Sequence, residues 1–260
     1  ELINHGAEVD AMNDNKKTPL IELLDFQCDD ETLESAQILL EHKANPHIDL
    51  GYWGSILHRV LDYKDAAVCF KTAQLLCAYN MNVNIKDQNN QTPLSIAVNK
   101  GMADLVELFL PKVPKEEINA PNCYQECLLH VAMQEEGYFY HSHTRPVIPK
   151  IVILLLQYGA DPNISYNDGK TMPLHVAVDR NQPEIIKELI NHGAHKHYKD
   201  TKNRTAYMIA KERGYKQNIL DLLYTDIIIH DQNEQEMVLV EHERNECHTE
   251  DHITRISILQ

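Results

Sequence analysis

One short phrase recurs six times along the 260 residues of the chain. A Thr, Ser or apolar residue is followed, usually after Pro, by an apolar residue that stands at the same point of every copy: Leu20, Leu57, Leu94, Leu129, Leu174 and Tyr207. These positions are 33 to 45 residues apart. Self-similarity at such a period is typical of stacked repeats, in which each unit buries its apolar face against its neighbours.

Each copy continues with small residues, a polar break, a run of Leu and Ile, and a turn. Leu189 to Ala194 reads Leu-Ile-Asn-His-Gly-Ala, and Leu155 to Ala160 reads Leu-Leu-Gln-Tyr-Gly-Ala. Together with starts such as Pro173-Leu-His-Val-Ala, these turns resemble the ankyrin repeat family over about residues 1 to 225. The resemblance implies an all-α solenoid of six to seven helix-turn-helix repeats.

The residue types at the copy boundaries fit that architecture. Thr or Ser caps a helix start, Pro is tolerated in the first turn, and Leu then faces inward. A helix that ends at Gly can close in the left-handed conformation, which we expect at Gly6, Gly159 and Gly193. In other copies the same point holds a different residue: Lys43, Asn80 or Val113.

The copies divide the chain as a partial repeat at 1–14 and full repeats near 15–49, 50–87, 88–120, 121–168, 169–200 and 201–225. The amino-terminal phrase matches Leu189 to Ala194, so we expect the chain to be a piece of a longer protein. Three copies carry extra residues between their two helices, and the longest insertion lies in 121–168. Insertions at one internal point emerge on one edge of the stack and often mark a working face.

Composition limits the classes of partner. The formal net charge is −15, which argues against a nucleic-acid surface and favours a basic protein partner. Six cysteines without Cys-x-x-Cys spacing predict reduced thiols in a cytoplasmic setting, and no stretch is apolar enough to span a bilayer. No phosphate-binding loop is present, and we expect no cofactor.

Three histidines follow the recurring Leu, at 58, 130 and 175. In the ankyrin family this His bonds loop backbone between neighbouring repeats, and we expect that structural role here. His141 and His143 in the long insertion could bind zinc, as could a second group at a repeat turn: His192, His195 and His197. The alternative for both groups is a solvated loop, and we predict no metal.

A catalytic alternative places a thiol nucleophile at Cys123 or Cys127, paired with His141. Against it, Cys127 stands where the family places a mostly buried Thr, and buried thiols are usually inert. We therefore predict a non-catalytic protein-binding scaffold. The rival is a cysteine-dependent enzyme with its site in the insertions or in an upstream domain.

Aromatic and amide side chains supply the candidate partner contacts. Tyr and Trp are enriched in interface hot spots, although each could instead pack on its own repeat. Loop tips and first helices should form a concave surface with candidate contacts Tyr52, Trp53, Asn89, Asn90, Tyr124, Tyr166 and Asn167. A second site on the opposite edge comprises Tyr138, Phe139, Tyr140 and Arg145.

Residues 226–260 break the pattern and hold nine acidic residues against Arg244 and Arg255. Their short apolar runs could cap the last repeat, while their acidity with few aromatics suggests disorder. Glutamates before the apolar end Ile256 to Gln260 also resemble carboxyl-terminal export signals of type IV secretion effectors of intracellular bacteria. That resemblance implies delivery into a host cell cytoplasm, where the repeats would bind a host protein.

Overall fold

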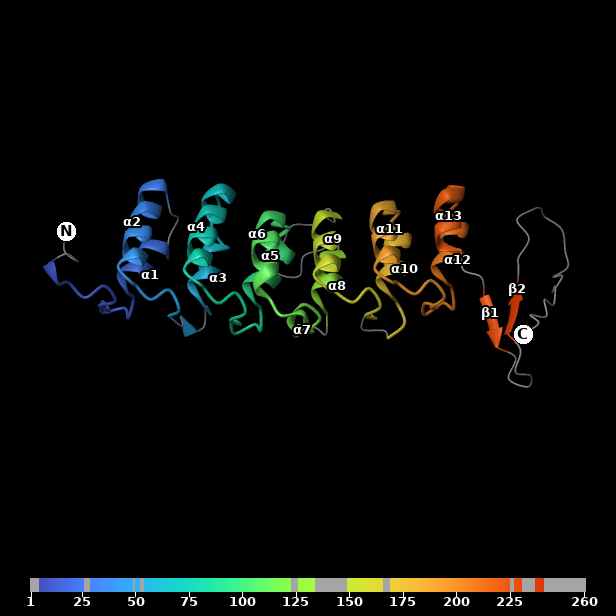
Figure 1. Cartoon of the computed structure of the whole chain (residues 1–260), viewed down its shortest axis with the longest axis horizontal. Coiled ribbons are helices and arrows are strands. Elements are labelled where there is room, and N and C mark those ends of the chain that lie inside the picture. The colour runs from blue at the N-terminus through green and yellow to red at the C-terminus, as the bar shows by residue number, and fades with distance from the viewer. Residues whose placement is uncertain are drawn as a thin grey trace.

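Six pairs of antiparallel helices stand side by side in one row (Figure 1). The computed structural model describes residues 5–25, 29–48, 50–51, 54–122, 126–133, 149–165 and 169–224, and the backbone of 227–230 and 237–240. The pairs are α1 (Pro19–Leu24) with α2 (Asp30–Glu41), α3 (Ile56–Val60) with α4 (Ala66–Ala78), α5 (Pro93–Lys100) with α6 (Ala103–Phe109), α8 (Leu128–Met133) with α9 (Pro149–Gln157), α10 (Pro173–Asp179) with α11 (Pro183–Asn191), and α12 (Ala206–Glu212) with α13 (Gln217–Leu223).

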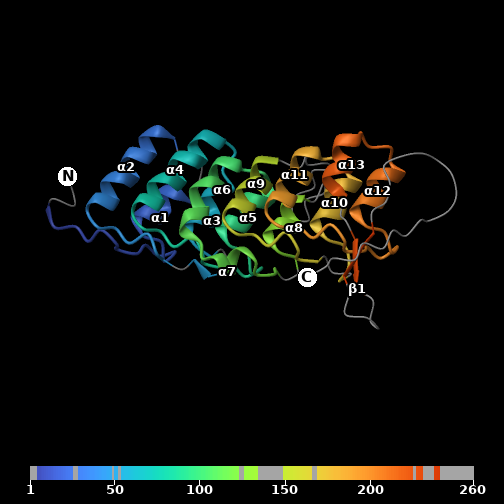
Figure 2. The ribbon, with the colours of Figure 1, turned by 45° about the vertical axis from the view of Figure 1, so that its right-hand side comes forward.

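The helices form two layers, because the first helix of each pair packs on the first helices of its neighbours (Figure 2). The core is a continuous strip between these layers. The recurring leucines lie in it and are at most 1% exposed: Leu20, Leu57, Leu94, Leu129 and Leu174. The inward position of the repeated Leu is therefore confirmed, and the all-α repeat array predicted from the sequence is confirmed with it.

Local capping explains where the first helices begin. The side chains of Thr18, Thr92 and Thr205 accept backbone N–H groups of the first helical turn. Pro19, Pro93 and Pro173 occupy the first helical position, where a missing N–H costs nothing. These residues fix where α1, α5, α10 and α12 begin.

The turns after the second helices follow the expected rule in five copies. Gly6, Gly159 and Gly193 have φ of 88°, 95° and 87°, and Lys43 and Asn80 adopt the same left-handed region without being glycine. Val113 differs, because it is extended at φ −105° after a short 3-10 helix, η3 (Leu110–Lys112). An extra helix, α7 (Lys115–Ile118), follows and replaces the usual turn between the third and fourth copies.

The two shorter insertions stabilise the repeats that carry them. Asp29 and Asp65 cap α2 and α4 by accepting backbone N–H groups at 2.8 to 3.0 Å. Tyr63 is 8% exposed and donates its hydroxyl to the Leu24 carbonyl of the preceding copy at 2.6 Å. The longest insertion, between Met133 and Pro149, lies outside the described residues.

A two-stranded antiparallel hairpin follows the last helix pair. Strand β1 (Ile227–His230) pairs with β2 (Met237–Val240), with Ile227 opposite Val240 and His230 opposite Met237. The short apolar runs of this segment are evident in the sequence, but their pairing as strands was not predicted. The register returns the chain to the root of the hairpin beside the array.

Candidate partner-binding groove

Three imidazoles join neighbouring copies, as expected for the repeated His. The Nδ1 atoms of His58, His130 and His175 accept the backbone N–H groups of Ser55, Cys127 and Met172 at the starts of their own helices. Each Nε2 lies 2.9 to 3.0 Å from a carbonyl oxygen of the next loop, on Gln91, Ile164 and Tyr198 respectively. Because Nδ1 accepts, the bridging proton is assigned to Nε2, which donates to that carbonyl. The structural role predicted for these histidines is confirmed.

The third copy breaks this series at Ser95. Its hydroxyl oxygen accepts the N–H of Thr92 at 2.9 Å, which is the capping contact that Nδ1 makes elsewhere. The same hydroxyl donates to the Thr92 carbonyl at 2.8 Å and so turns back on its own helix. The Ser95 hydroxyl therefore makes the capping contact that Nδ1 makes in the other copies. It does not make the contact to the next copy that Nε2 makes there.

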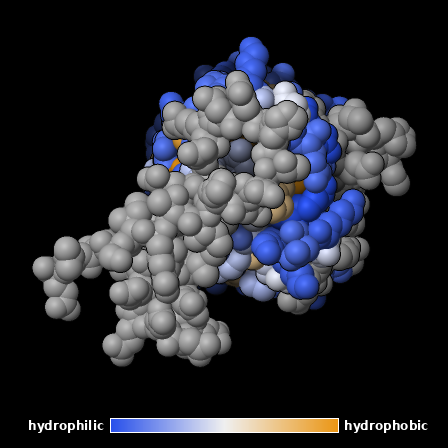
Figure 3. All heavy atoms as spheres, turned by 90° about the vertical axis from the view of Figure 1, so that its right-hand side faces the viewer, coloured by the Kyte–Doolittle hydropathy of each residue, from blue (hydrophilic) through white to orange (hydrophobic). Residues whose placement is uncertain are grey.

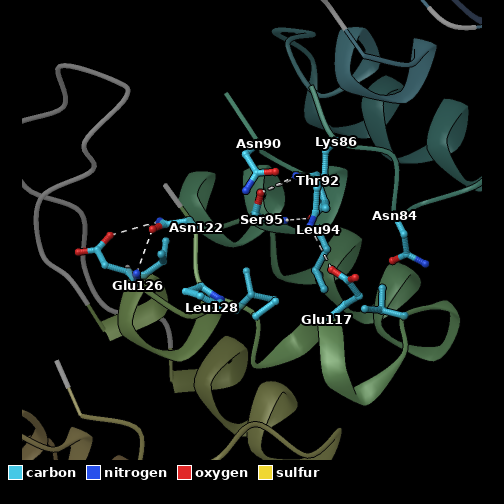
Figure 4. A pocket seen from close by; sticks show the side chains of 14 residues that line it. Asn84, Lys86, Asn90, Thr92, Leu94, Ser95, Glu117, Asn122, Glu126 and Leu128 are labelled. Carbon is cyan, nitrogen blue, oxygen red and sulfur yellow. Dashed lines mark hydrogen bonds and ion pairs between the residues drawn. The ribbon is translucent and has the colours of Figure 1, made fainter. Parts of the chain in front are cut away.

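A solvent-open groove lies beside this position, between the third and fourth copies (Figure 4). Its empty space, including the part open to solvent, is about 510 Å³. Apolar side chains and a rim of polar side chains share the lining, which comprises Leu94, Val113, Ala120, Pro121, Leu128 and Val131 with Asn84, Lys86, Asn90, Thr92, Ser95, Glu117, Asn122 and Glu126. Helix α7 contributes Glu117, so the extra turn between copies forms one wall.

The polar rim is ordered by contacts within the protein. Lys86 Nζ lies 3.5 Å from Glu117 Oε2, which ties the loop of the third copy to α7. Asn122 and Glu126 close the loop of the fourth copy. The Asn122 N–H donates to the Glu126 carbonyl at 2.8 Å, and the Glu126 N–H donates to Asn122 Oδ1 at 3.0 Å. Glu126 is only 7% exposed, and Asn122 Nδ2 donates to its carboxylate at 3.4 Å. The groove is thus largely preformed.

Asn90 is the candidate contact that the structure places in the groove. It sits at φ 60° at the tip of its loop, and its neighbour Asn89 is exposed on the same tip. Asp87 fixes this tip by accepting the N–H groups of Asn89 and Gln91 at 2.8 and 2.9 Å. The other candidates lie outside the described residues: Tyr52, Trp53, Tyr124, Tyr138, Phe139, Tyr140, Arg145, Tyr166 and Asn167.

Most residues of the groove were missed by sequence reasoning, which looked for aromatic side chains in loops. One signal was available: Ser95 interrupts the Leu-His pairs seen at positions 57–58, 129–130 and 174–175. A small residue where a bridging imidazole is expected indicates unfilled space between two copies. The second signal was the missing Gly-Ala turn near Val113, which marks the place of α7.

The described thiols do not favour the catalytic alternative. Burial raises the pKa of Cys69 to about 11 and also raises the pKa of Cys77 and of Cys127. A thiol with a raised pKa holds little of the nucleophilic thiolate at neutral pH. Cys123 and the insertion pair His141 and His143 lie outside the described residues.

Neither a metal cluster nor a membrane span is found in the part of the chain that the structure describes. No group of three or more His, Cys, Asp or Glu side chains is placed there to hold a metal ion. The turn that holds His192, His195 and His197 is included in that part. None of the described helices has both the length and the apolar character needed to cross a bilayer.

A row of helix pairs joined by bridging imidazoles, with a groove along its loop side, defines a stacked-repeat binding protein. The family model of ankyrin repeats matches residues 65–143 and 148–234, which is more than half of the chain. The chain therefore belongs to the ankyrin repeat family. Its repeats form a protein-interaction scaffold.

Two comparisons place the chain among known proteins. It is 37% identical over 81 residues to protein fem-1 homolog A-like of Mus musculus and to protein fem-1 homolog A of Rattus norvegicus. The match covers 30% of this chain and 12% of each of those proteins. The crystal structure of the ankyrin repeat domain of Bcl-3 superposes with a TM-score of 0.55 at 20% identity, over 85% of this chain and 88% of that one. This likeness concerns the fold.

Proposed function

We propose that the groove between the third and fourth copies binds an extended segment of a partner protein. One apolar side chain of the segment would lie over Leu94, Leu128 and Val131, while Asn90 and Asn122 would hydrogen-bond its backbone. Carboxamides suit this task because each offers both a donor and an acceptor. The net charge of −15 favours a partner with basic residues on either side of that segment.

The observation that carries the proposal is the replacement of the bridging imidazole by Ser95. In the second, fourth and fifth copies the ring fills the space between adjacent loops, whereas the serine leaves it open. Because the walls are already ordered by ion pairs and backbone bonds, a partner need order little of this protein when it binds. An open and preformed apolar floor is the usual form of a site for one anchoring side chain.

The test selects peptides of about twelve residues from a displayed library against the full chain, and then measures their binding to variants. Ser95→His should fill the groove and weaken selected peptides at least tenfold, as one lost buried anchor would. Ser95→Ala keeps the space and should bind like the parent. Gln37→His, on the exposed face of α2, controls for adding a histidine. Equal binding to the parent and to Ser95→His would refute the proposal.

We propose further that this interaction takes place in a host cell, with the protein delivered as a bacterial effector. The support is the sequence of the tail, where Glu234, Glu236, Glu241, Glu243, Glu246 and Glu250 precede the apolar end. The test is translocation of an amino-terminally fused reporter by a bacterium with a type IV system. Replacing those six glutamates by Gln should abolish delivery while the fold and peptide binding persist. Unchanged delivery would remove the tail as the signal.

A further inference from the structure

The loop between α11 and α12 differs in charge from the rest of this acidic chain. Residues 195–204 read His-Lys-His-Tyr-Lys-Asp-Thr-Lys-Asn-Arg, with four cationic side chains and two imidazoles against one carboxylate. We name these ten residues the basic loop. His195, His197, Tyr198, Lys199 and Lys202 are exposed on it.

Elsewhere in the described chain, five cationic side chains bind carboxylates of the preceding repeat: Arg59, Lys71, Lys100, Lys150 and Arg213. Arg59 binds Asp25 at 2.9 Å, and Lys150 binds Asp104 and Glu107 at 3.1 and 2.8 Å. Among the cationic residues of the basic loop, only Arg204 is paired with carboxylates, those of Asp200 and Glu212 at 2.9 and 3.0 Å. Within the described residues Lys199 and Lys202 form no ion pair. Their charge is available to another acidic group.

The shape of the basic loop is fixed before any such group binds. Asp200 accepts the N–H groups of Lys202 and Arg204 at 2.8 and 2.9 Å, and His195 N–H donates to Asn163 of the preceding copy at 2.8 Å. The rings of His195 and His197 stack with centroids 5.6 Å apart, and Tyr198 lies against both. The exposed cationic groups therefore stand on a preorganised support.

The acidic tail begins beside the basic loop. Lys196 Nζ donates to the carbonyl of Tyr224, the residue that ends α13, at 3.5 Å. Ile227 is three residues further on, which is at most about 10 Å of chain. Val240 pairs with Ile227, so the end of β2 lies one strand spacing, about 5 Å, from the start of β1. Glu241 follows directly.

We propose that residues 241–251 of the tail dock on the basic loop of the same molecule. This segment carries four glutamates and one aspartate against Arg244. A free acidic partner would meet a chain of net charge −15, whereas the tail is tethered at the loop and has an effective concentration in the millimolar range. Where described residues are visible at this end of the array, most are hydrophilic, with some apolar atoms between them (Figure 3). The contact does not depend on the peptide groove.

The first test follows the imidazoles of the full chain by NMR. Docked carboxylates would lie against the exposed rings of His195 and His197, so replacing Glu241, Glu243, Glu246 and Glu250 by Gln should move the ring resonances of both histidines at low salt. The difference should vanish in about 0.5 M salt, where charges are screened within a few ångströms. Glu8, Glu31, Glu34 and Glu41, which are exposed near the other end of the array, are each replaced by Gln in one control protein and give the same change in net charge.

The second test leaves the tail unchanged and alters the loop. Lys199→Gln with Lys202→Gln should speed cleavage of the tail by a glutamate-specific protease about three- to tenfold, the effect expected for losing two exposed charge pairs. Replacing Lys16 and Lys64, which are also exposed, is the matched control. Unchanged ring resonances and an unchanged cleavage rate would overturn the proposal. A third measurement adds polyglutamate to the parent and to the variant without the tail charges. An equal change in the His195 resonance in both would also overturn the proposal, because the loop would then be open to any acidic partner.

Discussion

At the scale of single residues, His130 shows how one buried side chain makes stability depend on pH. The ring is fully buried, and burial lowers its pKa below the ordinary 6.5, although its bond to the Ile164 carbonyl opposes that shift. The neutral ring accepts from Cys127 N–H and donates to Ile164, and protonation at Nδ1 would destroy the first contact. Its contribution therefore requires the neutral form.

The sign follows from proton uptake on unfolding. Below pH 6.5 the unfolded chain binds more protons at this position than the folded chain does, so the His130 contribution is complete above pH 6.5 and is lost as the pH falls toward the lowered pKa. We predict that His130→Gln costs about 2 kcal/mol at pH 7.5. Urea unfolding at pH 7.5 and 5.5 should show a smaller cost at the lower pH. A cost that grows as the pH falls would contradict the assigned direction.

Gly193 is a second residue whose chemistry decides a turn. Its φ is 87°, and a Cβ added there would meet nothing within 4 Å, so a substitution tests backbone strain alone. We predict that Gly193→Ala lowers the free energy of unfolding by about 1 to 2 kcal/mol. Lys43, already at φ 67°, provides the reverse test, because Lys43→Gly should be neutral or stabilising. Thermal unfolding of both variants measures the two changes in the free energy of unfolding.

At the scale of elements, the short insertions act as helix caps. Asp65 accepts the N–H groups of Ala67 and Val68 at the start of α4, where its negative charge also favours the helix dipole. We predict that Asp65→Ala destabilises the protein by about 1 kcal/mol, and that Asp65→Ser keeps most of the parental stability because serine caps a helix about as well as aspartate. Urea unfolding of the two variants separates the cap from the charge. Equal losses would assign the effect to charge.

Some features of the helices and loops could be predicted from the sequence, and others could not. Helix starts, the inward leucines and the bridging role of His58 were predictable, because each depends on local chemistry that recurs in several copies. The groove was not predicted, because it arises where copies differ: Ser95 replaces an imidazole and α7 replaces a turn. The pairing of β1 with β2 was also missed, since two short apolar runs do not specify a register.

At the scale of the whole molecule, the array has no single centre. In the part of the chain that the structure describes, each helix pair packs on the adjacent pairs, so folding couples along one dimension and the position of a defect decides its effect. Leu20 in the first pair and Leu129 in the fourth are both at most 1% exposed. Truncating either to Ala removes a similar buried side chain and should cost about 2 to 5 kcal/mol.

The two truncations should nevertheless unfold the chain differently. Leu129→Ala weakens both interfaces of a middle copy, so we predict that urea unfolding separates into two transitions, with a smaller denaturant slope for each. Leu20→Ala weakens one end, where fraying of the first pair leaves the remaining array cooperative. Hydrogen exchange should locate the difference, with α8 and α9 losing protection in Leu129→Ala while α1 and α2 retain it. A single transition of parental slope in both variants would mean that coupling between copies exceeds the cost of the cavity, and that the six pairs unfold as one unit.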